Sequence, residues 1–387
     1  MRPTPPSVEA TKRTGSLGVA GDPIAELRSS SGALVSVYVE RPAPGGFAAL
    51  LTELMKPLKE QAESMDRNVM KSVRSDAERI HDLAVRLEVD PAPAFAIFAS
   101  FLDDVFVVEP LTHPVRNVST IGPRPYLRPL RAAPRALRSG VIVADRKLAR
   151  TFIGFEGLVE ELGSPLDAEI GKSNYGGFGG YEEHGVRARS DETSARLWKQ
   201  AGWRLLEEHK ARPLDYLGVA GHGEAVEEIS RSLHPYLAKL PRAVFAASPQ
   251  NVTIPELRTD VVSQDKLVRQ QRQESIAGRV CDTAWSGGNA VLGLGATVEA
   301  ANAQAIDTLV VAGPFVRNGT ICSDCGQLAR DGAECSVCGA LTFAVDDIVA
   351  EVMDATVAAG GKVHQIRVAS ALDVEGIGAL TRFSVSG

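Results

Sequence analysis

Residues 290–311 read AVLGLGATVEAANAQAIDTLVV, and this stretch predicts the fold class of the chain. Apolar runs at 290–294 and 308–311 enclose an alanine-rich segment at 297–304. Short apolar runs beside glycine predict buried strands, and strands that alternate with helical segments predict a sheet covered by helices. We therefore expect an α/β fold. The glycines at 293 and 295 separate strand from helix, because Val298 stands where a dinucleotide-binding loop would need its third glycine.

Two near-identical cysteine pairs follow this stretch. Cys322 and Cys325 lie in CSDCG, and Cys335 and Cys338 lie in CSVCG. Two thiolates three residues apart can face one ion, and a glycine after the second permits a tight turn. Four such thiolates would close a tetrahedral, structural Zn²⁺ site. The alternatives are free thiols or two disulfides, and disulfides require an oxidising compartment. Cys281 stands apart, and we expect it to be a core or linker thiol.

The alternation of strands and helices extends to both ends of the chain. Toward the C-terminus we expect a helix at 348–358, a strand at 363–368 and a last stretch at 377–385. Toward the N-terminus we expect strands at 33–39, 94–99, 105–108, 140–146, 149–155, 216–220 and 243–247, and helical segments at 46–87, 224–237 and 263–276. A chain of 387 residues is expected to form two or three domains.

The composition predicts a soluble globular protein. Hydrophobic residues make up 44% of the chain and charged residues 23%. No apolar run approaches the ~18 residues that span a bilayer, and the residues after Met1 lack the apolar core of a signal peptide. Residues 1–30 are rich in Pro, Ser, Gly and Thr, and we expect them to be a flexible leader. We expect a cytoplasmic protein that binds no membrane.

A glycine-dense loop in the middle of the chain precedes a basic, amphipathic helix. Residues 174–181 read NYGGFGGY, and glycines at this density disfavour both strand and helix. From about 187 to 210, helical spacing places Arg189, Arg196 and Lys199 opposite an apolar side. That apolar side consists of Leu197, Trp198, Ala201 and Leu205. A glycine-rich loop at the end of a basic helix would fit a narrow, negatively charged binding site such as one formed by RNA. The alternative is an ordinary surface loop with a solvated helix face, which a Glu192–Arg196 pair would support.

A second basic segment contrasts with the net charge of −6. No acidic residue occurs between Glu109 and Asp145. Six arginines lie there: Arg116, Arg124, Arg128, Arg131, Arg135 and Arg138. Such a concentration in an acidic chain favours docking at one defined anionic site. The alternative is an extended connector between domains, kept in solution by its arginines.

The sequence shows no catalytic constellation. No Ser/His/Asp set or pair of suitably spaced carboxylates stands out. His184, just behind the glycine loop, could act as an acid or base or contact RNA, or it could be a loop residue without a role. His222, at a strand-to-helix turn, is expected to be structural.

Several segments together resemble the family of eukaryotic and archaeal peptide-chain release factors and its rescue relative Pelota. Residues 290–311 resemble a strand, helix and strand of the family's third domain, and 322–338 falls where archaeal members carry a zinc insert. The ending LDVEGIGALTRF at 372–383 is close to the family's C-terminal signature. Gly179-Gly180, followed by Arg187 and Arg189, matches the tip loop and basic helix of the middle domain. The resemblance covers residues 140–387 well and the first domain in general plan.

This resemblance implies a three-domain release-factor and Pelota-like α/β architecture with a zinc-ribbon insert in the third domain. The N-terminal α/β domain would span 31–137, and the middle α/β domain, with the tip loop, 138–274. The C-terminal α/β domain would span 275–387, with the zinc ribbon at 320–342.

One departure from the family bears on activity. Release factors of this family place glutamine directly after the paired glycines, where it supports attack of water on the peptidyl-tRNA ester. Here that position holds Tyr181, followed by Glu182 and Glu183, whose carboxylates would repel a hydroxide-like nucleophile. We therefore expect a protein that is not an enzyme. The pattern resembles the bacterial branch of the family, whose ribosome hibernation factors act under stress by occupying the ribosomal A site.

Three alternatives stay open. The first is a rescue or release factor that hydrolyses peptidyl-tRNA through His184 or Glu183. The second is a nuclease, which would need clustered metal-binding carboxylates, and the third is a zinc-bearing RNA adaptor without a ribosomal role.

The resemblance also implies the partners of a monomeric factor. The first domain would lie on 16S rRNA at the decoding centre, and the tip would approach the peptidyl transferase centre in 23S rRNA. The third domain would face a translation GTPase, for which the resemblance suggests elongation factor Tu. The implied tip residues are Gly176, Gly177, Phe178, Gly179, Gly180, Tyr181 and His184. The implied rRNA contacts are Arg116, Arg124, Arg128, Arg131, Arg187, Arg189, Arg196 and Lys199.

Overall fold

The computed structural model describes residues 23–29, 31–132, 136–168, 181–221 and 225–384, and of residues 181–190 only the backbone. The chain divides into two compact units. Unit 1 contains residues 1–133 and 273–387, and unit 2 contains residues 134–272. The segments before and after unit 2 fall into one unit because helix α4 (Arg128–Arg131) packs against helix α10 (Ile348–Ala358). The expected flexible leader lies largely outside the described residues.

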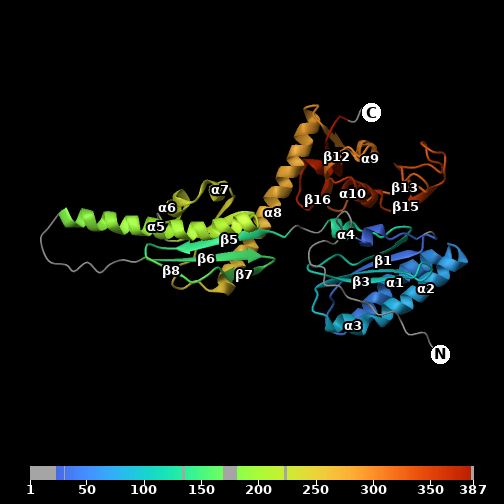
Figure 1. Ribbon diagram of the computed structural model, residues 1–387. Helices are drawn as coiled ribbons and strands as arrows, with labels where there is room; N and C mark the ends of the chain where they lie inside the picture. The colour runs from blue at the N-terminus through green and yellow to red at the C-terminus, as the bar shows by residue number, and fades with distance from the viewer. Residues whose placement is uncertain (1–22, 30, 133–135, 169–180, 222–224, 385–387) are drawn as a thin grey trace. The chain divides into compact units, whose positions relative to one another are not determined.

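The N-terminal part of unit 1 is a four-stranded antiparallel sheet in the order β3-β2-β1-β4 (Figure 1). Its strands are β1 (Leu34–Glu40), β2 (Ala94–Ser100), β3 (Val105–Leu111) and β4 (Val118–Gly122), and its helices are α1 (Phe47–Glu63), α2 (Arg67–Asp82) and α3 (Ala84–Val89). The strands expected at 33–39, 94–99 and 105–108 and the helices expected within 46–87 are confirmed. Strand β4 and helix α4 were not expected, since proline and arginine obscure the pattern of the segment 110–138.

Both faces of this first sheet are covered. Val35, Val37 and Val39 of β1 pack in the core formed with α1 and α2, whereas Tyr38, between Val37 and Val39, packs on the opposite face. That second face is covered by Leu127 and Leu130, which flank and form helix α4. Alternate residues of a strand point to opposite faces, so a strand that is apolar throughout is buried on both sides.

Unit 2 is built on a mixed sheet in the order β10-β9-β5-β6-β7, with β8 added beside β6. Its strands are β5 (Arg138–Ala144), β6 (Leu148–Phe155), β7 (Leu158–Glu161), β8 (Leu166–Asp167), β9 (Tyr216–Ala220) and β10 (Arg242–Phe245). Its helices are α5 (Tyr181–Ala211), α6 (Ala225–Ser232), α7 (Pro235–Ala238) and the first part of α8 (Ile254–Trp285). The expected hairpin of two strands around a polar turn is confirmed as β5 and β6, which pair antiparallel from Arg138 opposite Phe155 onward.

Helices cover both faces of the unit 2 sheet. Ile142 and Ala144 of β5 pack with α5, and Val141 and Val143 pack with the part of α8 that belongs to unit 2. Two helices differ from the sequence-based expectation in length. Helix α8 begins at Ile254 rather than near 263, and α5 begins at Tyr181 rather than near 187. Acidic residues stabilise the first turn of a helix, and α5 opens with Glu182 and Glu183.

The C-terminal part of unit 1 contains a second four-stranded sheet in the order β11-β17-β12-β16. These strands are β11 (Ala290–Leu292), β12 (Ile306–Ala312), β16 (Lys362–Ile366) and β17 (Ile377–Thr381), and helix α9 (Leu294–Asn302) follows β11. The predicted strand, helix and strand at 290–311 are confirmed. Gly293 precedes α9 with a positive φ of 81°, a value that only glycine adopts without strain, so its interpretation as punctuation also holds. Cys281 is buried in the core beside this sheet, as expected for a core thiol.

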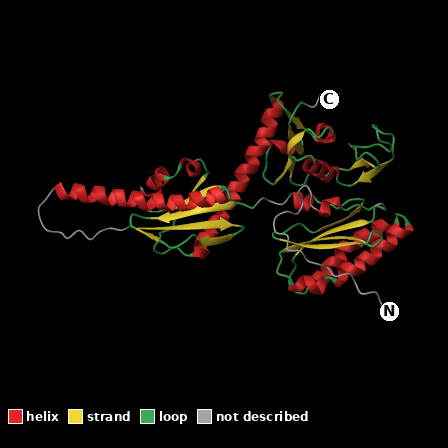
Figure 2. Cartoon of the chain, viewed as in Figure 1, coloured by secondary structure: helices red, strands yellow, loops and turns green. Residues whose placement is uncertain are grey.

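A small three-stranded sheet is inserted between β12 and α10. Its strands are β13 (Gly319–Cys322), β14 (Leu328–Ala329) and β15 (Thr342–Val345), and β13 lies in the middle. Ile321 and Leu328 anchor this insert in the core of the C-terminal part. Figure 2 shows how little regular structure it contains, which is typical of a metal-stabilised ribbon. Among the described helices, none has the length and apolarity needed to cross a membrane.

Candidate functional site

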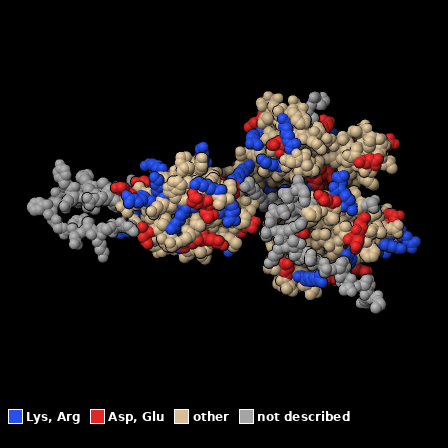
Figure 3. Space-filling view, in the orientation of Figure 1, with Lys and Arg blue, Asp and Glu red and all other residues tan. Residues whose placement is uncertain are grey.

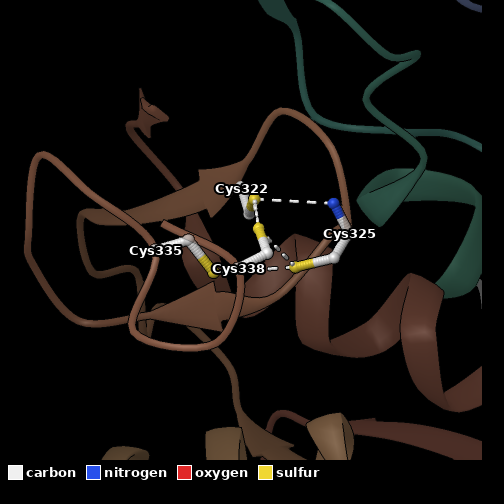
Figure 4. Close-up of side chains that lie close together, drawn as sticks. All are labelled: Cys322, Cys325, Cys335 and Cys338. Carbon is white, nitrogen blue, oxygen red and sulfur yellow. Dashed lines mark hydrogen bonds between the residues drawn. The ribbon is translucent and has the colours of Figure 1, made fainter. Parts of the chain in front are cut away.

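The four cysteines of the insert converge on one point (Figure 4). Their sulfur atoms all lie within 4.8 Å of one another. Cys322 Sγ is 3.4 Å from Cys338 Sγ, and Cys325 Sγ is 3.6 Å from both Cys335 Sγ and Cys338 Sγ. A tetrahedral ion with metal–sulfur bonds of about 2.3 Å requires sulfur separations of about 3.8 Å. All four cysteines are free thiols, so this cluster can hold one metal ion.

In each cysteine pair, backbone N–H groups donate hydrogen bonds to the sulfur of the first cysteine and so favour its thiolate form. The N–H groups of Asp324 and Cys325 donate to Cys322 Sγ at 3.4 and 3.5 Å, and the N–H of Val337 donates to Cys335 Sγ at 3.4 Å. The hydrogen bonds that Cys322 Sγ accepts, above all that from the Cys325 N–H, lower the pKa of the Cys322 thiol to about 6. Backbone donation from Cys338 likewise lowers the pKa of Cys335. Thiolates stabilised in this way are the metal-binding form of cysteine.

Glycine makes both cysteine turns possible. Gly326 and Gly339, each directly after the second cysteine of a pair, have φ values of 72° and 74°. A side chain would be strained in this left-handed conformation, so glycine is required there. The predicted role of these glycines is confirmed.

The predicted tip loop lies outside the described residues, whereas the helix that follows it, α5, is described. Gly176, Gly177, Phe178, Gly179 and Gly180 belong to the segment 169–180, which is not described. Tyr181 and His184 lie in the first turns of α5, where only the backbone is described. His184 is therefore a helix residue rather than a loop residue, and the same limit on side chains applies to Arg187 and Arg189. His222 also lies outside the described residues.

Helix α5 is a long arm anchored at one end. It has 31 residues and would be about 45 Å long. The first buried side chain in its described part is that of Ser194, whose hydroxyl donates to the Arg146 carbonyl at 3.0 Å. Trp198 Nε1 donates to the Asp145 carbonyl at 2.8 Å, so both bonds hold the helix on the β5–β6 turn. The preceding part of α5 extends past the sheet of unit 2 (Figure 1).

The two sides of α5 are as the sequence predicts. Leu197, Trp198, Ala201 and Leu205 are all buried against the sheet. Arg196 and Lys199 are exposed, and Arg196 forms an exposed ion pair with Glu192 at 3.3 Å. Lys and Arg side chains are interspersed with Asp and Glu over the face of unit 2 in Figure 3.

The arginines of the segment 110–138 form most of their contacts within unit 1. Arg128 Nη1 lies 2.7 Å from Asp347 Oδ2, and its Nη2 donates to the Phe315 carbonyl at 2.8 Å. The Tyr126 hydroxyl donates to the same Asp347 carboxylate at 3.0 Å. The Arg128 and Asp347 side chains are 7% and 9% exposed, so the pair is buried. We call the contacts of Arg124, Tyr126, Arg128 and Arg131 with α10 and its cap the arginine clamp.

Two further arginines complete the clamp. Arg131 Nε donates to Asp354 Oδ1 at 2.9 Å, and Arg124 Nη1 lies 3.7 Å from Glu351 Oε2. Arg128 and Arg131 are thus ion-paired with carboxylates of the same chain, and in this structure they are not available to bind an external phosphate. Their role as rRNA contacts stays a prediction that would require α4 to leave α10. Arg116 differs, because it is exposed between β3 and β4.

Sequence reasoning missed the carboxylate side of the clamp. Asp347, Glu351 and Asp354 are spaced four and three residues apart, which places them on one face of α10. The available signal was a stripe of acidic residues on an otherwise apolar helix, together with an arginine segment elsewhere in the chain that contains no acidic residue. The sequence gives no indication that the two segments meet.

Burial raises the pKa of two carboxyls of the clamp, Glu351 and Asp354. Burial, and next the neighbouring Asp354 carboxylate, raise the pKa of Glu351 to about 7 against the opposing effect of Arg124 and Arg28. The unfolded value is near 4.5, so the folded protein holds this proton more tightly. The contribution of Glu351 to stability is therefore greatest below about pH 4.5 and is lost as the pH rises through about 7.

We expect Glu351→Gln to stabilise unit 1 at about pH 8, by roughly 1–2 kcal/mol, and to leave its stability nearly unchanged at about pH 5. Glutamine imitates the protonated carboxyl and has no charge to bury. Urea unfolding of both proteins at the two pH values measures the difference. Equal stabilisation at both pH values would show that the effect is not due to ionisation of Glu351.

Comparisons with known proteins give similarities to solved structures only. No protein-family model matches the chain, and no curated protein does. The chain is similar to an archaeal translation termination factor, aRF1, with 15% identity over 93% of this chain and 95% of that chain and a TM-score of 0.23. It is also similar to Pelota from Archaeoglobus fulgidus, with 19% identity over 76% of this chain and 80% of that chain and a TM-score of 0.36. A third similar structure is archaeal Pelota in a model of ribosome-bound Pelota and ABCE1, with 19% identity, coverage of 76% and 78%, and a TM-score of 0.42. All three TM-scores lie below 0.5.

Proposed function

We propose that this protein is a ribosome-binding hibernation factor that occupies the A site and does not hydrolyse peptidyl-tRNA. The observation that supports this most directly is Tyr181, which follows Gly179-Gly180 and is the first residue of α5. Release factors of the family that the sequence resembles carry glutamine in this position. Without that amide, a polar group that could orient the attacking water is missing from its expected place. We further propose that the chain belongs to the bacterial branch of that family and is most like the hibernation factor Balon.

The arm of unit 2 suits the task of occupancy. Residues 181–193 precede Ser194, the first described buried residue of α5, and correspond to about 20 Å of helix. The glycine-rich segment is covalently joined to the start of this arm. An arm that extends past the sheet could carry the glycine-rich segment into a recessed binding site, and a glycine backbone could approach rRNA closely.

The acidic residues at the start of α5 support the same proposal. Glu182 and Glu183 would bring negative charge to a place where a hydrolytic factor must admit a nucleophile. In the alternative function, a rescue factor, Glu183 or His184 would have to replace the missing glutamine.

We propose that Zn²⁺ occupies the four-cysteine site. Four thiolates and no open position are typical of a structural zinc ion. The ion would hold the loops of the ribbon on the C-terminal part of unit 1, which we propose as the surface for a translation GTPase such as elongation factor Tu. The backbone N–H groups of the ribbon donate to Cys322 Sγ and Cys335 Sγ and so would orient these sulfurs toward the ion.

The proposal can be tested with purified ribosomes that carry labelled peptidyl-tRNA. We expect the full chain to co-sediment with ribosomes, to bind more weakly as salt rises, and to release no peptide above the rate without factor. The double variant Arg187→Ala/Arg189→Ala should bind at least about tenfold more weakly, since each arginine would neutralise a phosphate. Arg231→Ala is the matched control, because Arg231 is exposed in the same unit and already paired with Glu227.

Two results would contradict the proposal. Failure of the wild-type chain to bind ribosomes would exclude a ribosomal function. Rapid peptide release by the wild type, abolished in Glu183→Ala or His184→Ala, would establish the hydrolytic alternative instead.

A further inference from the structure

An exposed cluster of aromatic rings lies on unit 2, formed by residues that the site described above does not include. Trp203 belongs to α5, and His234 and Tyr236 lie at the start of α7. The ring centroids of Trp203 and His234 are 5.8 Å apart, and those of His234 and Tyr236 are 4.9 Å apart. Trp203 is 46% exposed and Tyr236 59% exposed. Large aromatic residues gathered at the surface are typical of binding sites rather than of a solvated face.

The fold sets the orientation of these rings. His234 is the N-cap of α7, and its Nδ1 accepts a hydrogen bond from the Tyr236 backbone N–H at 3.3 Å. Leu233 and Leu237, on either side of the cap, are buried in the core against α5. The His234 ring is therefore fixed between the other two. A preorganised ring cluster loses little conformational freedom when a ligand binds.

The charges around the rings favour an anionic ligand. The Lys210 ammonium lies 5.7 Å from the Trp203 ring centroid and 2.8 Å from Glu207, so the acidic residue one turn beyond Trp203 is neutralised. Lys199 lies one helical turn before Trp203 and is exposed. Lys239 lies one turn after Tyr236 and is also exposed. Among the described residues, neither Lys199 nor Lys239 forms an ion pair.

We propose that Trp203 and Tyr236, on either side of His234, form a platform whose separate ring faces stack unpaired RNA bases, since their planes are tilted by 54° and 73° from that of His234. Lys199 and Lys239 are placed to contact the flanking phosphates. Aromatic faces beside lysines are what a single-stranded RNA segment requires, because its bases stack and its backbone is anionic. A protein partner that used these rings would gain less from the surrounding lysines. The assignment of the RNA as ribosomal rests on the proposed function, whereas the platform itself is defined by its own residues.

Fluorescence titration of the full chain with a short single-stranded RNA tests the platform without a ribosome. The chain has three tryptophans, of which Trp198 is buried and Trp285 is exposed. In the background Trp285→Phe, quenching on addition of RNA therefore reports on Trp203. We expect quenching by the single strand and much less by a duplex of the same sequence. The variants that lack Trp203 are measured by the fluorescence anisotropy of a dye-labelled RNA of the same sequence. Trp203→Ala should weaken its binding about tenfold, and Trp203→Phe should retain most of it.

Phe155→Ala is the matched control, because Phe155 is an aromatic residue of β6 in the same unit with a similar exposure of 45%. Equal affinity of Trp203→Ala, Phe155→Ala and wild type for the single strand would overturn the platform. Weaker ribosome binding by Trp203→Ala with unchanged affinity for the oligonucleotide would also overturn it and indicate a protein contact. Quenching by RNA in a chain that does not co-sediment with ribosomes would support the platform and refute the ribosomal function, so the two failures are distinguishable.

Discussion

Replacing Cys322 with serine is expected to reduce the metal content from about one ion per chain to nearly none. Cys322 ends β13 and is buried, and its sulfur receives two backbone hydrogen bonds. Serine cannot supply the thiolate, and three cysteines close a tetrahedral site poorly. Metal-binding free energies at four-cysteine sites are large, about 10–16 kcal/mol in isolated zinc-finger peptides, so most of the order of the ribbon is expected to depend on the ion.

Elemental analysis of the purified chain measures the metal directly, and limited trypsin digestion measures the ribbon. Arg330 follows β14 within the insert, so cleavage there should become much faster in Cys322→Ser than in the wild type. Cys281→Ser is the control, since Cys281 is buried elsewhere in unit 1 and should leave the metal content unchanged. A wild-type chain that contains no metal and resists trypsin at Arg330 would contradict both the site and its structural role.

The second large effect is expected in the arginine clamp, where Asp347→Ala should lower the free energy of unfolding by about 3–5 kcal/mol. The alanine would leave the buried Arg128 guanidinium without its counter-charge and the Tyr126 hydroxyl without its acceptor. It would also remove the N-cap of α10, because Asp347 accepts a hydrogen bond from the Ala350 N–H. A buried charge that has lost its partner costs far more than the intact pair contributes.

Three comparison variants separate these contributions in urea unfolding. Asp347→Asn keeps the cap and the acceptor oxygen but not the charge, so it should be less destabilising than alanine. The double variant Asp347→Ala/Arg128→Ala removes both charges and should recover part of the loss. Glu227→Ala breaks the exposed pair with Arg231, whose side chains are about three-quarters exposed, and should cost no more than about 1 kcal/mol. If Asp347→Ala costs no more than Glu227→Ala, the clamp does not hold the two parts of unit 1 together.

The elements that could be predicted from the sequence are those set by neighbouring residues. The helix at 348–358 was predicted with the bounds that the structure gives it, and the strands β1, β2, β5 and β9 were located to within a residue or two. Their apolar runs determine the structure locally. The four-cysteine cluster was also predictable, because two pairs with short spacings constrain each other within one small insert.

The errors in element length arose where polar sequence forms regular structure. Helix α5 begins six residues earlier than its apolar pattern indicates, because the residues from Tyr181 onward carry no apolar side that marks a helix. Helix α8 passes from unit 2 into unit 1 as one helix, although its pattern is weakly amphipathic. Strand β4 is short and lies in a segment rich in proline. A periodic signal cannot reveal elements whose burial is decided by distant parts of the chain.

By itself, the sequence determined the α/β alternation, the thiolate cluster and the replacement of the expected glutamine by Tyr181, since each depends on residues that are close in the chain. Only the tertiary structure decided that Arg128 and Arg131 face the carboxylates of α10, and that Trp203 meets His234 and Tyr236 at the surface of unit 2. The partners in these contacts are separated by tens to hundreds of residues. Which distant side chains meet depends on how whole sheets and helices pack, and local patterns of charge and hydropathy carry no record of that packing.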